Sequence, residues 1–184
     1  MINDIYLKKK ALRKLIRKLK KELTPELRKI KSDSIMNKIE DDVHFQNAET
    51  VFICWAMDDE VDTRDLIIRW SDRKIFILPS IDGDDLILKR FTGINCLKNG
   101  DLYDIPEPSG EPFEDISGIE LAIIPGVAFD KNNNRMGRGK AYYDKILLQM
   151  KNKTFLLGIC YDFQFIDSVP VETHDMLMDK VVYS

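Results

Sequence analysis

One stretch of the chain, residues 123–147, constrains the fold more than any other. It reads IIPGVAFDKNNNRMGRGKAYYDKIL. The apolar run at its start is typical of a buried strand, which Pro125 and Gly126 terminate. Turn-forming residues fill positions 130–134, and a helix is expected after them, ending at about Met150. A buried strand that leads through a connection into a helix is the repeating unit of α/β folds with parallel sheets.

The connection between that strand and that helix has the composition of an anion-binding loop. Arg135, Arg138 and Lys140 alternate with Gly137 and Gly139 directly before the helix. Unobstructed backbone amides, a helix N-terminus and three cations together favour a phosphate group. The loop matches neither the P-loop pattern nor the dinucleotide-binding fingerprint. A tight solvated turn with incidental charge is the alternative.

Acidic residues accompany this loop at two places. Asp144 lies in the first turn of the expected helix, where it is either a salt-bridge partner or a ligand of Mg²⁺ that is shared with phosphates. The segment MDDEVDT, residues 57–63, follows a second buried strand. Its Glu60 could accept hydrogen bonds from an amino-heterocycle. Its three aspartates are expected to stabilise the N-terminus of the next helix, with Asp62 as the cap.

The rest of the chain repeats the alternation of helices and strands. Helices are expected at 7–22, 24–39 and 63–71, and strands at 50–56, 74–78, 86–91, 121–124, 154–160 and 181–183. Thr24 and Pro25 should open the second helix, Pro79 should stop the second strand, and residues 92–117 should form an excursion. This pattern predicts a single three-layer α/β/α domain over residues 1–184, with a mainly parallel, Rossmann-like sheet.

Ligands of such sheets bind beyond the carboxyl ends of the strands. We therefore expect three segments to converge at that edge. They are residues 57–63, the glycine loop and the C-terminal tail at 170–176.

Charge is unevenly distributed along the chain, whose net charge is −3. Residues 1–31 are strongly basic and the remainder is acidic, as in some proteins that bind nucleic acid or membranes. Lys9 and Arg13, one helical turn apart, could instead clamp a polyphosphate, or belong to a solvated lysine-rich face. The first helix lacks interleaved aromatic residues, and its apolar stripe requires burial; the stripe comprises Leu12, Leu15, Ile16 and Leu19. We therefore expect no nucleic-acid and no membrane partner.

Other features narrow the class further. No apolar run reaches the ~20 residues that span a bilayer, and the N-terminus lacks the features of a signal peptide, so a cytoplasmic protein is expected. A monomer is expected as well. Cys54, Cys96 and Cys160 form no metal or redox motif. Cys54 and Cys160 lie in strand-like runs, and buried structural thiols are expected there. A phosphosugar or CoA-ester enzyme on a similar fold is a further hypothesis. It would need a catalytic acid or histidine, for which Glu60 is the candidate.

Taken together, these motifs resemble the 5-formyltetrahydrofolate cyclo-ligase family, also called methenyltetrahydrofolate synthetase. PGVAFDKNNNRMGRGKAYYD is similar to the family signature PG-x-x-FD-x-x-G-x-R-[LM]-G-x-G-x-G-YYD. The K-xxx-R, M-x-DE-[IV]-x-T and P-V-x-x-x-D-M motifs also occur in the family's order, and nearly the whole chain is covered. Asn133 and Ala141 stand where the family has glycine.

Members of this family convert 5-formyltetrahydrofolate to 5,10-methenyltetrahydrofolate and consume ATP with Mg²⁺. The resemblance implies that ATP phosphorylates the formyl oxygen and that N10 then closes the ring as phosphate leaves. The implied ATP-binding residues are Lys9, Arg13, Arg135, Met136, Gly137, Arg138, Gly139, Lys140, Ala141, Tyr142 and Tyr143. The implied substrate-binding residues are Trp55, Glu60, Arg138, Gly139, Lys140, Ala141 and Tyr142. The implied catalytic residues are Arg138, Lys140 and Tyr142, and the implied Mg²⁺ ligands are Asp144 and Asp175.

Overall fold

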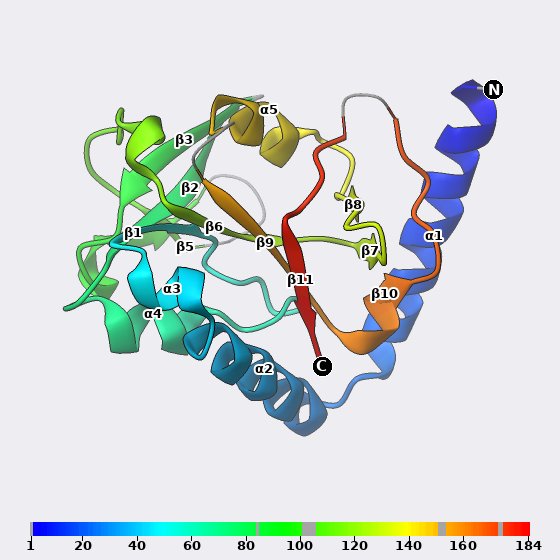
Figure 1. The fold of residues 1–184 in the computed structure, drawn as a ribbon, viewed down its shortest axis with the longest axis horizontal. Coiled ribbons are helices and arrows are strands. Elements are labelled where there is room, and N and C mark those ends of the chain that lie inside the picture. The colour runs from blue at the N-terminus through cyan, green and yellow to red at the C-terminus, as the bar shows by residue number, and fades with distance from the viewer. Residues whose placement is uncertain (1, 84, 101–105, 151–153, 173–174) are drawn as a thin grey trace.

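A six-stranded sheet forms the centre of the protein in a computed structural model that describes residues 2–83, 85–100, 106–150, 154–172 and 175–184 (Figure 1). The strand order is β11-β9-β6-β1-β2-β3. The strands are β1 (Thr50–Ile53), β2 (Ile75–Asp82), β3 (Asp85–Arg90), β6 (Leu121–Pro125), β9 (Phe155–Cys160) and β11 (Lys180–Tyr183). Neighbouring strands are parallel except β2 and β3, which are antiparallel. The predicted mainly parallel sheet is confirmed.

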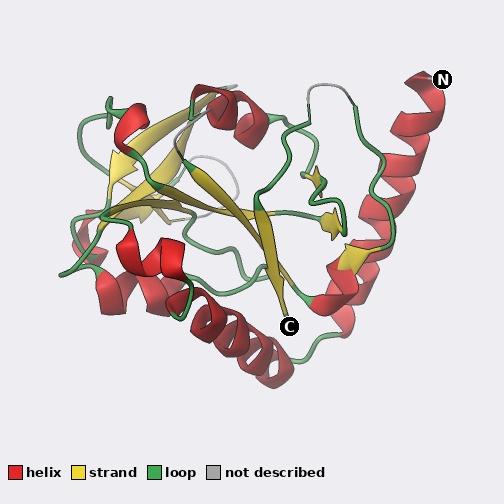
Figure 2. Cartoon of the chain, viewed as in Figure 1, coloured by secondary structure: helices red, strands yellow, loops and turns green. Residues whose placement is uncertain are grey.

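Helices cover both faces of this sheet (Figures 1 and 2). On one face lie α2 (Pro25–Glu40), α3 (Val43–Asn47) and α4 (Arg64–Trp70), and on the other lies α5 (Tyr142–Gln149). Alternate residues of β1 supply the two cores, since Val51 and Ile53 pack with α2–α4 and Phe52 packs with α5. The predicted three-layer α/β/α arrangement is confirmed. The hydroxyl of Thr24 accepts a hydrogen bond from the Leu27 amide, so the predicted start of α2 is also confirmed.

The prediction that Pro79 ends the second strand is wrong, because β2 continues to Asp82. Only Ile75–Ile77 of β2 pair with β1, whereas Pro79 pairs with Leu88 of β3. Pro79 therefore lies where β2 has a single neighbour, and proline is tolerated at such edge positions.

A second, three-stranded sheet lies beyond the end of β6 and was not predicted. It consists of β7 (Ala128–Asp130), β8 (Arg135–Met136) and β10 (Phe165–Ile166), in the order β10-β7-β8. The predicted turn at 130–134 joins β7 to β8. The fully buried carboxylate of Asp130 organises this turn by accepting hydrogen bonds from the amides of Asn132, Asn134 and Val169. Burial raises the pKa of Asp130, but these hydrogen bonds outweigh it and hold the pKa below its usual value.

The expected excursion at 92–117 contains short elements within its described part. They are the 3-10 turns Ile94–Cys96 and Ile116–Gly118 and the strands β4 (Leu97–Asn99) and β5 (Pro106–Pro108), which pair antiparallel. Residues 101–105 of the excursion lie outside the described part of the chain. A further 3-10 turn, Asp162–Gln164, follows β9.

The first helix, α1 (Ile2–Glu22), stands at the edge of the molecule beside β7, β8 and β10 (Figure 1). Ile16 is buried as predicted, and Leu12 packs against the small sheet. The prediction for Leu15 is wrong, because its side chain is 52% exposed. Two lysines, Lys9 and Lys20, are buried on the inward face instead. An apolar stripe could not reveal this, because the inward face of α1 contacts charged segments as well as apolar ones.

Candidate functional site

The inward face of α1 contacts three separate segments: the 57–63 segment after β1, the glycine loop after β8 and the C-terminal tail after β10. Lys9 reaches the C-terminal tail, and the Arg13 Nε donates to the Gly137 carbonyl of the glycine loop at 3.0 Å. Lys20 Nζ lies 3.3 Å from Asp59 in the segment after β1. The predicted convergence of the 57–63 segment, the glycine loop and the tail is therefore confirmed, with α1 as the element that joins them.

Arg138 of the glycine loop lies directly against the acidic segment. Its Nη2 donates to Asp59 Oδ1 at 2.7 Å and to Glu60 Oε1 at 2.9 Å, and its Nε donates to Glu60 Oε1 at 3.2 Å. The Glu60 side chain is 13% exposed and its other oxygen accepts from the Met57 amide. Burial raises the pKa of Asp59, but Lys20 and Arg138 outweigh this and hold the pKa below its usual value. Lys20, Asp59, Glu60 and Arg138 thus form one group of paired charges, the Arg138 cluster. It joins the glycine loop, predicted to bind phosphate, to Glu60, predicted to accept hydrogen bonds from a heterocycle.

The acidic segment is only partly a helix cap. Asp62 bonds the start of α4, since its Oδ1 accepts from the Arg64 amide at 3.0 Å. The N-cap position itself is Thr63, which makes no side-chain capping bond, so the prediction of Asp62 as the cap residue is wrong by one position. The expectation that Asp59 stabilises this helix start is wrong, because that carboxylate binds Lys20 and Arg138. Asp58 is 98% exposed and lies 3.9 Å from the guanidinium of Arg64, the first residue of α4, which agrees with the expectation for that aspartate.

The backbone of the glycine loop is held in unusual conformations. Gly139 has φ of 103°, and a Cβ built on it would lie 3.3 Å from the guanidinium carbon of Arg13. Ala141, the residue before α5, is left-handed with φ of 55° and ψ of 14°. Asn133 is also left-handed, with φ of 60°. The two positions where the family has glycine thus require positive φ, which asparagine tolerates better than alanine.

Arg135 and Asp144 form an inner ion pair under the loop. Arg135 Nη2 lies 2.7 Å from Asp144 Oδ1, and the Arg135 side chain is 2% exposed. The guanidinium also lies over the ring of Tyr143, 5.6 Å from the ring centre. The Arg135 Nε has no hydrogen-bond partner in the described part of the chain. Both Arg135 and the neighbouring Met136 are buried, so a ligand would meet the loop chiefly through the residues after them.

The C-terminal tail contributes a second ion pair. Lys9 Nζ lies 2.7 Å from Asp175 Oδ2 and 2.8 Å from Glu172 Oε2, and the Lys9 side chain is 8% exposed. Burial lowers the pKa of Lys9, but the two carboxylates outweigh it and raise the pKa above its usual value. The tail is tied to the 130–134 turn as well, because the Met178 amide donates to the Asn133 carbonyl at 2.9 Å.

The remaining predicted residues lie around this cluster. Trp55 stacks on Phe91 with 5.8 Å between ring centres, which forms an apolar surface after β1. The Tyr142 hydroxyl donates to the Gly83 carbonyl at 3.2 Å. Lys140 is exposed and has no ion-pair partner in the described ranges.

Other groups contribute less to the chemistry. All three cysteines are free thiols, and burial raises the pKa of Cys54 and of Cys160, which makes them inert. No helix in the described ranges combines the length and the hydropathy needed to cross a membrane.

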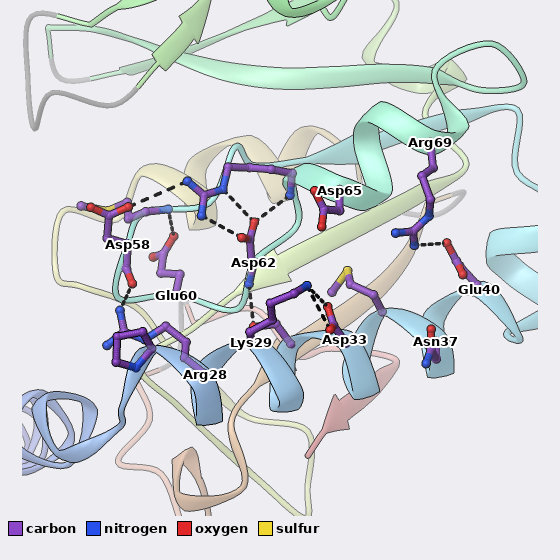
Figure 3. Close-up of a pocket in the computed structure, with 15 residues that line it drawn as sticks. Arg28, Lys29, Asp33, Asn37, Glu40, Asp58, Glu60, Asp62, Asp65 and Arg69 are labelled. Atoms are coloured by element: carbon purple, nitrogen blue, oxygen red, sulfur yellow. Dashed lines mark hydrogen bonds and ion pairs between the residues drawn. The ribbon is translucent and has the colours of Figure 1, made fainter.

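A hollow of about 640 Å³ lies between α2, α4 and the 57–63 segment (Figure 3). Internal ion pairs occupy its walls, among them Lys29 with Asp33 and Arg69 with Glu40. Glu60 lines it, but no residue of the glycine loop does. We therefore place the site at the Arg138 cluster, where cations and acids from different segments meet, and not in this hollow.

The sequence analysis did not identify three charged residues of the site: Lys20 and Asp59 beside Arg138, and Glu172 beside Lys9. Lys20 lies three turns after Lys9 on the same face of α1, a spacing that was available as a signal. Asp59 was assigned to the N-terminus of the next helix, and no sequence motif singled out Lys20 or Glu172.

Comparison with known proteins gives consistent matches. The model of the 5-formyltetrahydrofolate cyclo-ligase family matches residues 6–184. The 5-formyltetrahydrofolate cyclo-ligase of Mus musculus is 29% identical, covering 95% of this chain and 93% of its own. That of Escherichia coli K12 is 28% identical, covering 91% and 96%. The NMR structure of Aquifex aeolicus 5,10-methenyltetrahydrofolate synthetase is 30% identical, with a TM-score of 0.84 and coverage of 95% and 89%.

Proposed function

The chain belongs to the 5-formyltetrahydrofolate cyclo-ligase family, and from this premise we propose that it converts 5-formyltetrahydrofolate to 5,10-methenyltetrahydrofolate with ATP and Mg²⁺ at the Arg138 cluster. The observation that carries the proposal is the contact between Arg138 and Glu60. It brings a cation suited to phosphate within 2.9 Å of a carboxylate suited to a pterin. A reaction that transfers a phosphoryl group from ATP to a folate needs a phosphate-binding cation and a pterin-binding carboxylate side by side.

The formyl oxygen attacks the γ-phosphorus of ATP, and ADP leaves. N10 then attacks the activated formyl carbon, the C–O bond breaks, inorganic phosphate departs with the oxygen, and N10 loses its proton. Such phosphoryl transfer depends on positioning and on neutralising charge. Arg138 and Lys140 flank Gly139 and are exposed, so both can reach the transferring group. Lys9 and Arg13 are proposed to bind the ATP phosphates from α1.

Glu60 is the proposed acceptor for the amino and ring N–H groups of the pterin. Its low exposure would strengthen those hydrogen bonds relative to water. The Trp55–Phe91 stack offers an apolar surface beside it. Tyr142, tied to Gly83, is proposed to close the loop over the folate.

Mg²⁺ suits the carboxylates that the site provides. No group of three or more His, Cys, Asp or Glu residues suited to a metal occurs in the part of the chain that the structure describes. Mg²⁺ commonly takes only one or two carboxylates and fills its shell with phosphates and water. Asp144 uses Oδ1 for Arg135, which leaves Oδ2 available, and Asp175 lies beside Lys9. These two residues would hold the ion, which when bound neutralises phosphate charge.

We also propose a monomer that works in the cytoplasm. Purified protein should show an absorbance rise from the methenyl product that requires 5-formyltetrahydrofolate, ATP and Mg²⁺ together. Arg138→Ala should lower kcat by roughly 10²–10³-fold, the effect of removing one donor to transition-state charge. Arg17→Ala, a change at an exposed arginine of α1, is the matched control and should keep wild-type rates. Absence of turnover by folded wild-type protein would refute the proposal.

A further inference from the structure

Asp59 lies between two cations, Lys20 and Arg138, that are far apart in the sequence. Its Oδ2 faces Lys20 Nζ of α1 at 3.3 Å, and its Oδ1 accepts from Arg138 Nη2 of the glycine loop at 2.7 Å. Each carboxylate oxygen therefore binds one cation. A residue that only stabilised its own segment would need neither contact.

Lys20 is dedicated to this carboxylate. Its side chain is 9% exposed, and in the described part of the chain Asp59 is the only hydrogen-bond partner of its ammonium group. Burial lowers the pKa of Lys20, and the charge of Asp59 opposes that effect. A buried ammonium is costly unless it is paired, so this lysine fixes the position of Asp59.

Arg138 is held by Glu60 and Asp59, and only Glu60 is proposed to bind the pterin. Glu60 receives two of the three hydrogen bonds of Arg138, yet its oxygens are the proposed acceptors for the pterin. When the pterin takes them, the bond to Asp59 at 2.7 Å is the one that remains. Arg138 also lies between two glycines, whose backbone freedom would otherwise let the guanidinium drift.

We propose that Asp59, fixed by Lys20, is the positioning residue for Arg138, and that it keeps the guanidinium over the site after the folate has taken Glu60. The inference rests on the proposed function for the identity of the ligand at Glu60. The two ion pairs that Asp59 forms with Lys20 and Arg138 can be tested independently of that function. Asp59 acts through Arg138 and touches no reacting atom.

Steady-state kinetics provide the first test. Asp59→Asn should lower kcat about tenfold, the weight of one charge-assisted hydrogen bond at a partly exposed site, and should leave the KM for folate within about twofold. Asp59→Glu should restore part of the loss, and Lys20→Met should reproduce a smaller loss. Asp58→Asn, the same substitution at the neighbouring exposed aspartate, should have no effect.

A double-mutant comparison separates positioning from any independent role. If Asp59 acts only through Arg138, then Asp59→Asn should change kcat less than about twofold in the Arg138→Ala background. An equal loss of kcat in both backgrounds would overturn the proposal. So would an effect confined to the KM for folate.

The second test does not depend on catalysis. The ¹⁵N relaxation of the Arg138 Nε–H group, assigned with Arg138→Lys, reports whether the guanidinium is held. Glu60→Gln mimics the loss of the Glu60 charge and should leave the group ordered, whereas Glu60→Gln with Asp59→Asn should reduce its order parameter below about 0.6. An unchanged order parameter in the double variant would overturn the positioning role even in an active enzyme. An inactive wild type with the expected relaxation would refute the proposed function alone.

Discussion

Ala141 holds a backbone conformation that its side chain disfavours, and replacing it with glycine should stabilise the protein. With φ of 55° and ψ of 14°, it lies in the left-handed region, which costs an L-residue roughly 1–2 kcal/mol. Glycine removes that cost but adds freedom to the unfolded chain, worth about 0.4–1 kcal/mol. The net gain for Ala141→Gly is therefore about 0.5–1 kcal/mol, and at about 2–4 °C per kcal/mol for a chain of this size, the expected rise in Tm is about 1–4 °C.

The same substitution elsewhere gives a control of opposite sign. Ala11 is exposed within α1, where glycine costs about 1 kcal/mol relative to alanine. Urea unfolding should therefore move the midpoint up for Ala141→Gly and down for Ala11→Gly, with an unchanged m-value in both. If Ala141→Gly destabilised the protein as much as Ala11→Gly does, the assigned strain would be wrong.

Three further changes have outcomes set by single contacts. Asp144→Asn should abolish Mg²⁺-dependent activity and also lower the free energy of unfolding by about 3 kcal/mol, because Arg135 is left buried without a charged partner. Full activity in magnesium titrations would reject the metal role. The pKa of Asp130 is lowered in the folded state, so the folded protein binds a proton at this carboxylate less readily than the unfolded protein does. The contribution of the carboxylate to the free energy of unfolding is therefore complete above about pH 4 and is lost as the pH falls through the folded-state pKa. Urea unfolding between about pH 3 and pH 6 should thus show a shallower loss of stability in Asp130→Asn than in the wild type, and identical slopes would contradict the assignment. Lys9→Met should raise the KM for ATP about tenfold or more if its ammonium meets phosphate, whereas Lys10→Met, at an exposed neighbour, should leave that KM unchanged.

Local chemistry could be predicted from the sequence because its causes are local. The strand, turn, glycine loop and helix of residues 123–147 appear in the predicted order. Thr24 also caps α2 as predicted. The β7–β8 hairpin was missed because its strands are too short to show a period, and the bonds that organise it converge on one buried carboxylate, Asp130. No pattern of neighbouring residues reports such a convergence.

The partners of the charged residues could not be predicted, for a different reason. Arg138 and Glu60 lie far apart in the sequence, and only the parallel order of β1 and β6 brings their loops together. Lys20 points inward while Leu15 points outward, which reverses the rule that apolar residues face the core. That reversal makes sense only when Asp59 is known to lie opposite the helix.

The cation and the acids of the Arg138 cluster are paired with one another, so each proposed ligand has to displace an internal partner when it binds. Arg138 is paired with Glu60, so a pterin that takes Glu60 releases a guanidinium for phosphate, and a phosphate that takes Arg138 releases Glu60 for the pterin. Each ligand thus removes a competitor of the other, and by reciprocity we expect MgATP and 5-formyltetrahydrofolate to raise each other's affinity by the same factor, within about 5–150-fold. Binding titrations with a non-hydrolysable ATP analogue, with and without the folate, measure that factor. In Arg138→Ala the competition no longer exists, so the factor should fall toward one. A coupling that survives intact in this variant would show that the Arg138–Glu60 pair is not what the ligands exchange.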